Sequence, residues 1–253
     1  SHRGSDGHRP NAGGEVEAAS GRLGYDLGDR WDVSLRLDWN DAWADDPEPV
    51  GAPRQPVAER FATDAVFAVA TLGHHHRLGD GHLKLWLDHG DLDWLQWDVV
   101  AAEPFESLTA SRNWGARLRE TLAPWAGGEL LMGIDHDDYG GRFVEQRPAG
   151  PQNPNDVRLR ATAPYVMVSH VFDGRVTVTP SAGVRFTESD PYGGHWGGQA
   201  GLKVEFASTE LYANAAHAFN LPGAWAAVQY AGWGLGDRWQ DLEPEVMDHV
   251  EVG

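Results

Sequence analysis

The feature that most constrains this chain is a strict alternation of apolar and polar residues over long stretches. Segment 31–44 is the clearest case. One of its faces would carry Trp31, Val33, Leu35, Leu37 and Trp39, and the other Asp32, Ser34, Arg36, Asp38 and Asn40. Segment 175–190 repeats the pattern, with apolar residues on most even positions from Val176 to Phe186. A period of two is that of a β-strand with one apolar and one polar face. The pattern therefore predicts strands that separate an apolar environment from a polar one.

The length of segment 31–44 indicates which apolar environment this is. Trp31 and Trp39 lie eight positions apart, roughly 26 Å along a strand at about 3.3 Å per residue. Tilted by about 40°, such a strand spans the apolar band of an outer-membrane barrel, whose rims carry aromatic girdles. Strands of soluble sandwiches average about 5–6 residues, so the length favours a membrane barrel. A soluble β-sandwich is the alternative.

The connections between the expected strands alternate in length. We expect strands at about 15–27, 31–44, 62–78, 82–97, 107–124, 130–146, 161–172 and 175–190, two more within 201–219, and a last one from Val246. Short connections (28–30, 79–81, 125–129, 173–174, 208–209) alternate with longer ones (45–60, 98–106, 147–158, 189–198, 219–245). Antiparallel strands joined in this way place every tight turn at one end, as in outer-membrane barrels. Because backbone groups in lipid need partners between strands, the complete sheet must close. We predict an all-β antiparallel meander of about 11 strands that forms a segment of a larger transmembrane barrel.

Composition excludes several other classes. The net charge of −18 would repel nucleic acid. The chain has no cysteine for disulfides or thiolate metal sites. The chain has no run of eighteen apolar residues, so the sequence excludes a transmembrane helix. The polar, Gly-rich opening and the end within an expected strand predict a piece of a longer protein.

Five stretches, in order along nearly the whole chain, resemble the barrel of TonB-dependent outer-membrane receptors. They are SDGHRPN (5–11), ADDPEP (44–49), RVTVTPSAGVRF (175–186), ELYANAAHAFNLPG (210–223) and DLEPEVMDHVEVG (241–253). The residues that carry the match are Arg185, Leu211, Tyr212, Asn214, Phe219, Pro222, Glu245 and Glu251. Two positions depart from the family pattern, since Glu243 replaces the usual Lys and Val252 the usual Leu.

The resemblance implies that residues 1–253 are part of a 22-stranded barrel in a Gram-negative outer membrane, without its N-terminal plug domain and last strands. Receptors of this family import ferric siderophores, haem, cobalamin or other metal chelates, with energy from the TonB complex. The implied partners are outer-membrane lipid, the plug, TonB and the solute; no catalytic residue and no cofactor is implied. A passive porin or a barrel enzyme is the alternative within the outer membrane.

Aromatic residues in two long connections are the first candidates for solute contact, since they offer large contact areas at low entropic cost. They are Tyr192, His195 and Trp196 in one connection, and Trp225, Tyr230, Trp233 and Trp239 in the other. The alternative is a rim girdle or packing between loops. Arg112, Arg117 and Arg119 are expected to line the lumen, where they would meet acidic solutes or plug carboxylates.

Two polar clusters are weaker candidates. Asp137 and Asp138, beside Asp135 and His136, would suit a cationic or hydroxyl-rich solute, but their spacing is not that of a calcium loop. A solvated polar face is the alternative. In His74-His75-His76, only His74 and His76 would share a strand face. No third ligand is apparent in the sequence, so we predict no metal site. No Gly-x-Ser-x-Gly elbow or phosphate loop indicates an enzyme.

Overall fold

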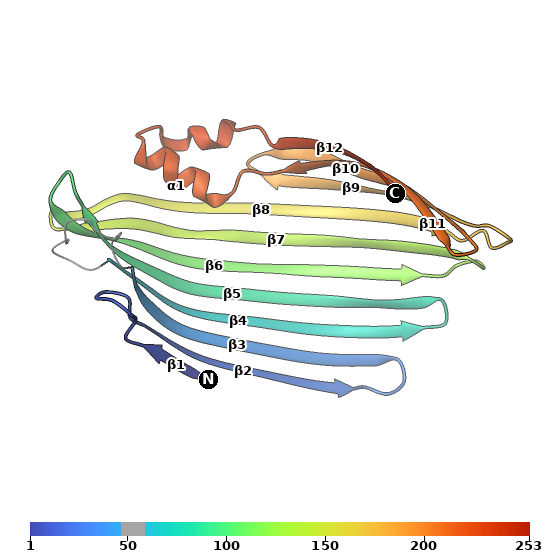
Figure 1. Cartoon of the computed structure of the whole chain (residues 1–253), viewed down its shortest axis with the longest axis horizontal. Coiled ribbons are helices and arrows are strands. Elements are labelled where there is room, and N and C mark those ends of the chain that lie inside the picture. The colour runs from blue at the N-terminus through green and yellow to red at the C-terminus, as the bar shows by residue number, and fades with distance from the viewer. Residues whose placement is uncertain (47–58) are drawn as a thin grey trace.

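The computed structural model describes residues 1–46 and 59–253, which form one antiparallel sheet (Figure 1). Its strands are β1 (His2–Ser5), β2 (Gly14–Asp26), β3 (Trp31–Asp46), β4 (Glu59–His76), β5 (Gly79–Asp98), β6 (Glu103–Leu122), β7 (Gly128–Arg147), β8 (Gly150–His170), β9 (Thr177–Asp190), β10 (Gly193–Phe206), β11 (Thr209–Asn220) and β12 (Glu245–Val252). Each strand pairs with its neighbours in sequence, in the order β1 to β12. This confirms the all-β antiparallel meander. The sheet is open, because β1 and β12 do not pair with each other.

The two ends of the sheet differ less than the predicted alternation of connection lengths implies, because the end that carries the longest connection also has two-residue turns, 148–149 between β7 and β8 and 191–192 between β9 and β10. Tight turns join β2 to β3, β4 to β5, β6 to β7 and β10 to β11 at one end, on the right in Figure 1. The longest described connection, 221–244, lies at the other end and contains the helix α1 (Ala224–Gly232) and the 3₁₀ helix η1 (Gly236–Asp241). We call these the turn end and the loop end. No helix in the described residues is long and apolar enough to cross a membrane.

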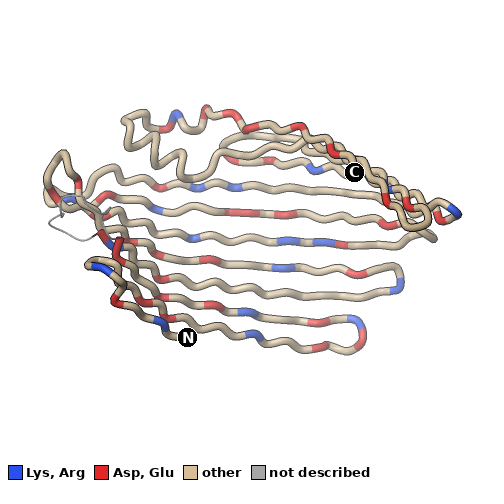
Figure 2. Tube along the Cα trace, in the orientation of Figure 1, with Lys and Arg blue, Asp and Glu red and all other residues tan. Residues whose placement is uncertain are grey.

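Strand register gives the sheet two chemically distinct faces. Leu35 pairs with Ala70, Ala70 with Leu85, and Leu85 with Ala116, so apolar side chains line up across four strands. Leu35 and Leu85 are about half exposed, at 50% and 48%, and no second sheet covers them in the described chain. We call this the outer face. The opposite, inner face carries Lys84 and Arg117, and Figure 2 shows basic and acidic residues in the middle of several strands. A long apolar face left open to its surroundings is the surface that lipid covers.

The strands extend further toward the loop end than expected, and the sheet has twelve strands rather than about eleven. Residues 147–158 were expected to be a loop, but β7 continues to Arg147 and β8 starts at Gly150. Residues 99–102 and 191–192 likewise form turns, and β1 lies in the expected opening loop. About 9–11 residues span a membrane, whereas β4 to β8 have 18 to 21. Beyond the apolar band both faces of the sheet meet water. The strands there no longer alternate apolar and polar residues, so the sequence does not show that they are strands. Of the predicted connection 45–60, residues 47–58 lie outside the described residues.

Candidate functional site

The largest buried cluster in the described chain lies where α1 and η1 fold onto β8. Ala227 of α1 and Trp239 of η1 are almost fully buried, at 0% and 5% exposure, against Val157 and Leu159 of β8. Leu159 pairs with Tyr139, and Ala161 pairs with Asp137, so the cluster lies on the inner face. The connection 221–244 therefore turns back over the inner wall at the loop end (Figure 1).

Tyr192 belongs to the margin of this cluster. Its ring meets Trp239 edge-on, with centroids 6.3 Å apart. Its hydroxyl is buried and finds no hydrogen-bond partner in the described part of the chain. Burial, with a smaller contribution from the nearby Tyr139, raises the pKa of Tyr192 to about 12. Tyr192 therefore packs as a neutral phenol, and Tyr230 also packs against the cluster.

Two tryptophans, one in α1 and one directly after it, remain open. Trp225 and Trp233 are 60% and 65% exposed. The ring of Trp225 meets Phe143 of β7 edge-on at 6.2 Å, and Trp233 lies 5.8 Å from Tyr230. Each indole is held by one ring contact and is otherwise largely exposed, so α1 and the residue after it present two oriented aromatic surfaces at the loop end.

A hollow of about 620 Å³ lies on the inner wall beside this segment. It is lined in part by Asp137, Tyr139, Tyr165, Arg185 and Thr187. Its volume falls within the range of about 300–1,000 Å³ common for small-molecule sites. Tyrosine hydroxyls, an arginine and a carboxylate give it both hydrogen-bond donors and acceptors. We call it the inner-wall pocket.

Ion pairs fix the two charged side chains that line this pocket, Asp137 and Arg185. Arg117 Nη2 donates to Asp137 Oδ1 at 2.6 Å, and Arg185 Nη1 donates to Asp135 Oδ2 at 2.7 Å. Arg117 Nε also lies 3.5 Å from Asp135 Oδ1. Two arginines and two aspartates balance each other, and Arg185 also lies over the ring of Tyr165 at 5.6 Å. The pocket therefore has oriented polar groups but little net charge.

The structure divides the other predicted site residues between the two faces. His195 Nε2 lies 2.9 Å from the carbonyl oxygen of Tyr192, at the loop end. The ring of Trp196 lies 4.8 Å from that of Phe186 at a tilt of 45°, on the outer face with Val184, which favours the girdle interpretation. Asp138 also lies on the outer side, where it pairs with Arg158 at 2.9 Å and Arg160 at 3.2 Å.

The expectation that Arg112 lines the lumen beside Arg117 and Arg119 is wrong. Arg112 pairs with His89 on the outer face, whereas Arg117 pairs with Lys84 and Arg119 with His82 on the inner face. Residues 112 and 117 are separated by an odd number of positions, so a regular strand points them to opposite sides.

The residues that match the family pattern mainly hold the sheet together. Tyr212 Oη donates to Glu251 Oε1 at 3.0 Å, which links β11 to β12. Asn214 faces Glu251 in the register, and Glu245 faces Asn220 at the start of β12. Pro222 lies just before α1, and Leu211 is exposed on β11. The ring of Phe219 lies 5.3 Å from that of His195.

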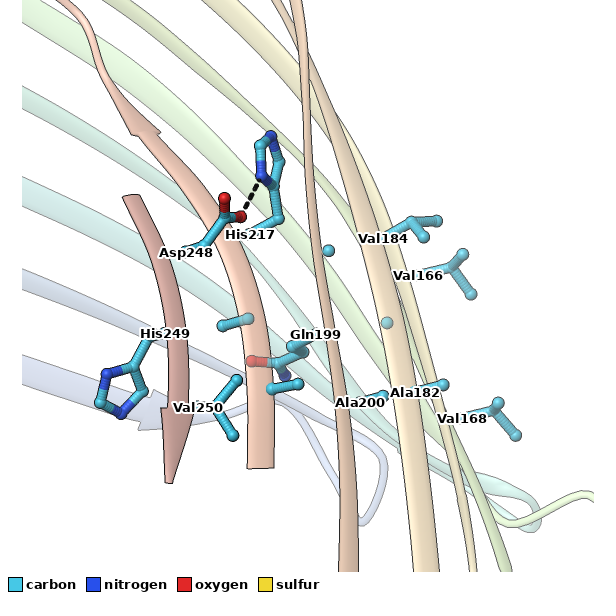
Figure 3. A pocket seen from close by; sticks show the side chains of 14 residues that line it. Val166, Val168, Ala182, Val184, Gln199, Ala200, His217, Asp248, His249 and Val250 are labelled. Atoms are coloured by element: carbon cyan, nitrogen blue, oxygen red, sulfur yellow. Dashed lines mark hydrogen bonds and ion pairs between the residues drawn. The ribbon is translucent and has the colours of Figure 1, made fainter. Parts of the chain in front are cut away.

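A second hollow, of about 680 Å³, lies across β8 to β12 and is mainly apolar. Figure 3 shows Val166, Val168 and Val184 pointing to one side of these strands. His217 Nδ1 and Asp248 Oδ1 are 2.7 Å apart at its edge. Its valines belong to the outer face, so this groove belongs to the surface that meets lipid rather than to the inner wall.

Sequence reasoning missed Tyr139, Tyr165 and Thr187 of the inner-wall pocket. Tyr139 and Asp137 share a strand face because they are two positions apart, so alternation alone links them. Tyr165 and Thr187 join them only through the register of β7 to β9, which no single segment of the sequence displays.

The family model described as "TonB dependent receptor-like, beta-barrel" matches residues 2–253. No curated protein sequence matches the chain. Among solved structures, the copper transporter OprC superposes with a TM-score of 0.74 at 12% identity, over 99% of this chain and 45% of that one. BauA, the ferric preacinetobactin receptor of Acinetobacter baumannii, gives a TM-score of 0.65 at 11% identity, over 99% of this chain and 46% of that one. FauA, the alcaligin outer-membrane receptor of Bordetella pertussis, gives a TM-score of 0.57 at 15% identity, over 82% of this chain and 36% of that one. The chain spans less than half the length of these proteins.

Proposed function

Because the chain belongs to the TonB-dependent receptor β-barrel family, whose barrels lie in the outer membrane of Gram-negative bacteria, we propose that it forms part of an importer of a scarce solute. The solute would be a ferric siderophore, haem, cobalamin or another metal chelate. The complete protein would contain a plug domain, and the TonB complex would supply the energy. The fold supports this proposal, and the substrate class rests on the site described above.

The observation that carries the proposal is the α1–η1 segment folded over the inner wall beside a pocket. A chelate of several hundred daltons needs a large, partly apolar surface with a few oriented polar groups. The exposed faces of Trp225 and Trp233 offer such a surface at the loop end. Asp137, Tyr139 and Arg185 offer the polar groups a short distance further in.

Uptake by the full-length receptor tests this function. It is expressed in a strain that lacks its own siderophore, haem and cobalamin receptors, and labelled complexes of each class are supplied. We expect uptake of one class, and its loss when tonB is deleted. Uptake that is independent of TonB would indicate a passive porin. No uptake of any class would contradict the proposal.

Tryptophan variants test the proposed surface. Replacing Trp225 or Trp233 with Ala removes most of an exposed indole, and we expect substrate affinity to fall roughly tenfold, since anchoring aromatic groups contribute about 1–2 kcal/mol or more. Trp196→Ala is the matched control, because Trp196 is equally exposed but lies on the outer face. An equal loss in all three variants would contradict the site.

A further inference from the structure

Three metal-ligating side chains meet at the turn end, far along the strands from the proposed substrate site. His74 and His76 lie on β4 and Glu120 lies on β6. His74 Nε2 is 3.0 Å from Glu120 Oε2, and His76 Nε2 is 2.6 Å from Glu120 Oε1. Their ligand atoms all lie within 4.8 Å of one another. The sequence shows the two histidines but not the carboxylate, which lies 44 residues further along the chain.

The register of the sheet explains how the carboxylate reaches the histidines. His74 pairs with Gly81 of β5, and Gly81 pairs with Glu120, so the three residues form one row across three strands. Next-nearest strands are about 9.6 Å apart, and a side chain on β5 would normally separate them. A Cβ at position 81 would lie 2.0 Å from Glu120 Oε2 and 2.7 Å from His74 Cε1. The absence of a side chain at Gly81 therefore makes room for the cluster.

The cluster is also held in place by its neighbours. The rings of His74 and His76 are nearly parallel, 5.6 Å apart, and Trp31 packs on His74 at 5.2 Å. The side chains of His74 and Glu120 are only 24% and 22% exposed. The Leu78 backbone N–H donates to His76 Nδ1 at 3.2 Å, which orients that ring. Coordination through Nε2 would move the imidazole proton to Nδ1 and release the Leu78 bond.

We propose that His74, His76 and Glu120 bind a divalent transition-metal ion of the zinc class. Two imidazole nitrogens and one carboxylate form a ligand set that zinc accepts, with a further position open to water. Two ligands at about 2.0–2.1 Å from a tetrahedral ion lie about 3.3 Å apart. The separations here, 3.0 and 2.6 Å, are shorter, so the ligand atoms would move apart to admit the ion. The ion would bridge β4 and β6 across β5, on the outer face beside Trp31. It is a resident ion at the turn end, distinct from any imported metal.

Metal titration of the full-length receptor in detergent micelles tests the proposal. The protein is stripped with a chelator, and Zn²⁺ binding is followed by calorimetry and Co²⁺ binding by visible absorption. We expect one equivalent bound by the wild type to be lost in His74→Ala/His76→Ala and in the nearly isosteric Glu120→Gln. His75→Ala is the matched control. It removes a histidine from the same triplet, but His75 lies on the inner side, 4.0 Å from Asp32. It should bind Zn²⁺ as the wild type does.

A glycine variant tests the geometry with all three ligands retained. Gly81→Ala should weaken Zn²⁺ binding by about tenfold or more, as expected when the surroundings of metal ligands are disturbed. Heat-dependent electrophoretic mobility verifies that each variant forms a barrel. Equal stoichiometry in the wild type and in His74→Ala/His76→Ala would overturn the proposal. So would an equal loss in His75→Ala, which would indicate binding to any exposed histidine.

Discussion

The packing of η1 against β8 predicts that Trp239→Ala opens the α1–η1 segment without unfolding the sheet. A tryptophan side chain buries roughly 200 Å², which at about 25 cal/mol/Å² corresponds to about 5 kcal/mol. This is an upper bound, because the detached segment retains some contacts. Trp→Ala changes in cores cost about 3–5 kcal/mol. Since Trp239 is 5% exposed, we expect Trp239→Ala to lower the free energy of opening the segment by about 3 kcal/mol. This raises the open fraction of the segment roughly 100-fold.

Hydrogen exchange of the full-length receptor measures this opening directly. We expect the amides of residues 224–241 to exchange roughly 100-fold faster in Trp239→Ala, while those of β3 to β8 keep the wild-type rates. Trp233→Ala is the matched control from the same segment, since its indole is 65% exposed and should change exchange by less than about threefold.

Two outcomes would refute this reasoning. If Trp233→Ala and Trp239→Ala accelerated exchange equally, burial against β8 would not be what holds the segment. If Trp239→Ala instead accelerated exchange throughout β7 and β8, the cluster would stabilise the sheet itself and not only the α1–η1 segment.

Three further predictions follow from the two faces and the loop end. Leu85→Arg places a charge in the apolar band and should cost about 2–4 kcal/mol in urea unfolding from lipid vesicles, whereas Gln199→Arg on the inner face should cost less than about 1 kcal/mol; equal costs would contradict the assignment of faces. The fold raises the pKa of Tyr192, so the neutral phenol stabilises the α1–η1 packing. This stabilisation is complete below pH 10 and is lost as pH rises through about 12. Tyr192→Phe should remove that loss, as followed by exchange or fluorescence above pH 10, and an unchanged profile would contradict it. Asp138→Asn should lower stability by only about 1 kcal/mol in thermal unfolding, because its partners Arg158 and Arg160 are partly exposed although Asp138 itself is buried; a loss above about 3 kcal/mol would show that the two ion pairs behave as buried.

The faces of the sheet could be predicted from the sequence because lipid and water impose opposite requirements on successive residues. Trp31, Leu35 and Trp39 alternate with charged residues, and that pattern already specifies a strand, its length and its apolar side. The same logic fails beyond the apolar band. Residues 150–156 are strand but carry no apolar face, because neither side meets lipid, and they resemble a loop.

The candidate sites were predictable only as far as single strands determine them. Alternation places Arg112 and Arg117 on opposite faces of β6, because they are five positions apart, so the sequence alone excludes Arg112 from the lumen. It cannot show that Glu120 lies beside His74, because this depends on how β5 and β6 align. Nor can it show that the connection containing Trp225 and Trp239 folds inward, because this depends on packing against β8, a strand far away in the sequence.

The sequential pairing of the strands has a consequence for how such a sheet forms. Each strand finds its partner next to it in the chain, so closing each hairpin orders only a short span and costs little chain entropy. Growth in chain order, one hairpin after another, is then the least costly route. The α1–η1 segment breaks this rule, because it docks on β8, about seventy residues earlier. It has no surface to bind until that wall exists, so its docking is expected among the last steps of assembly.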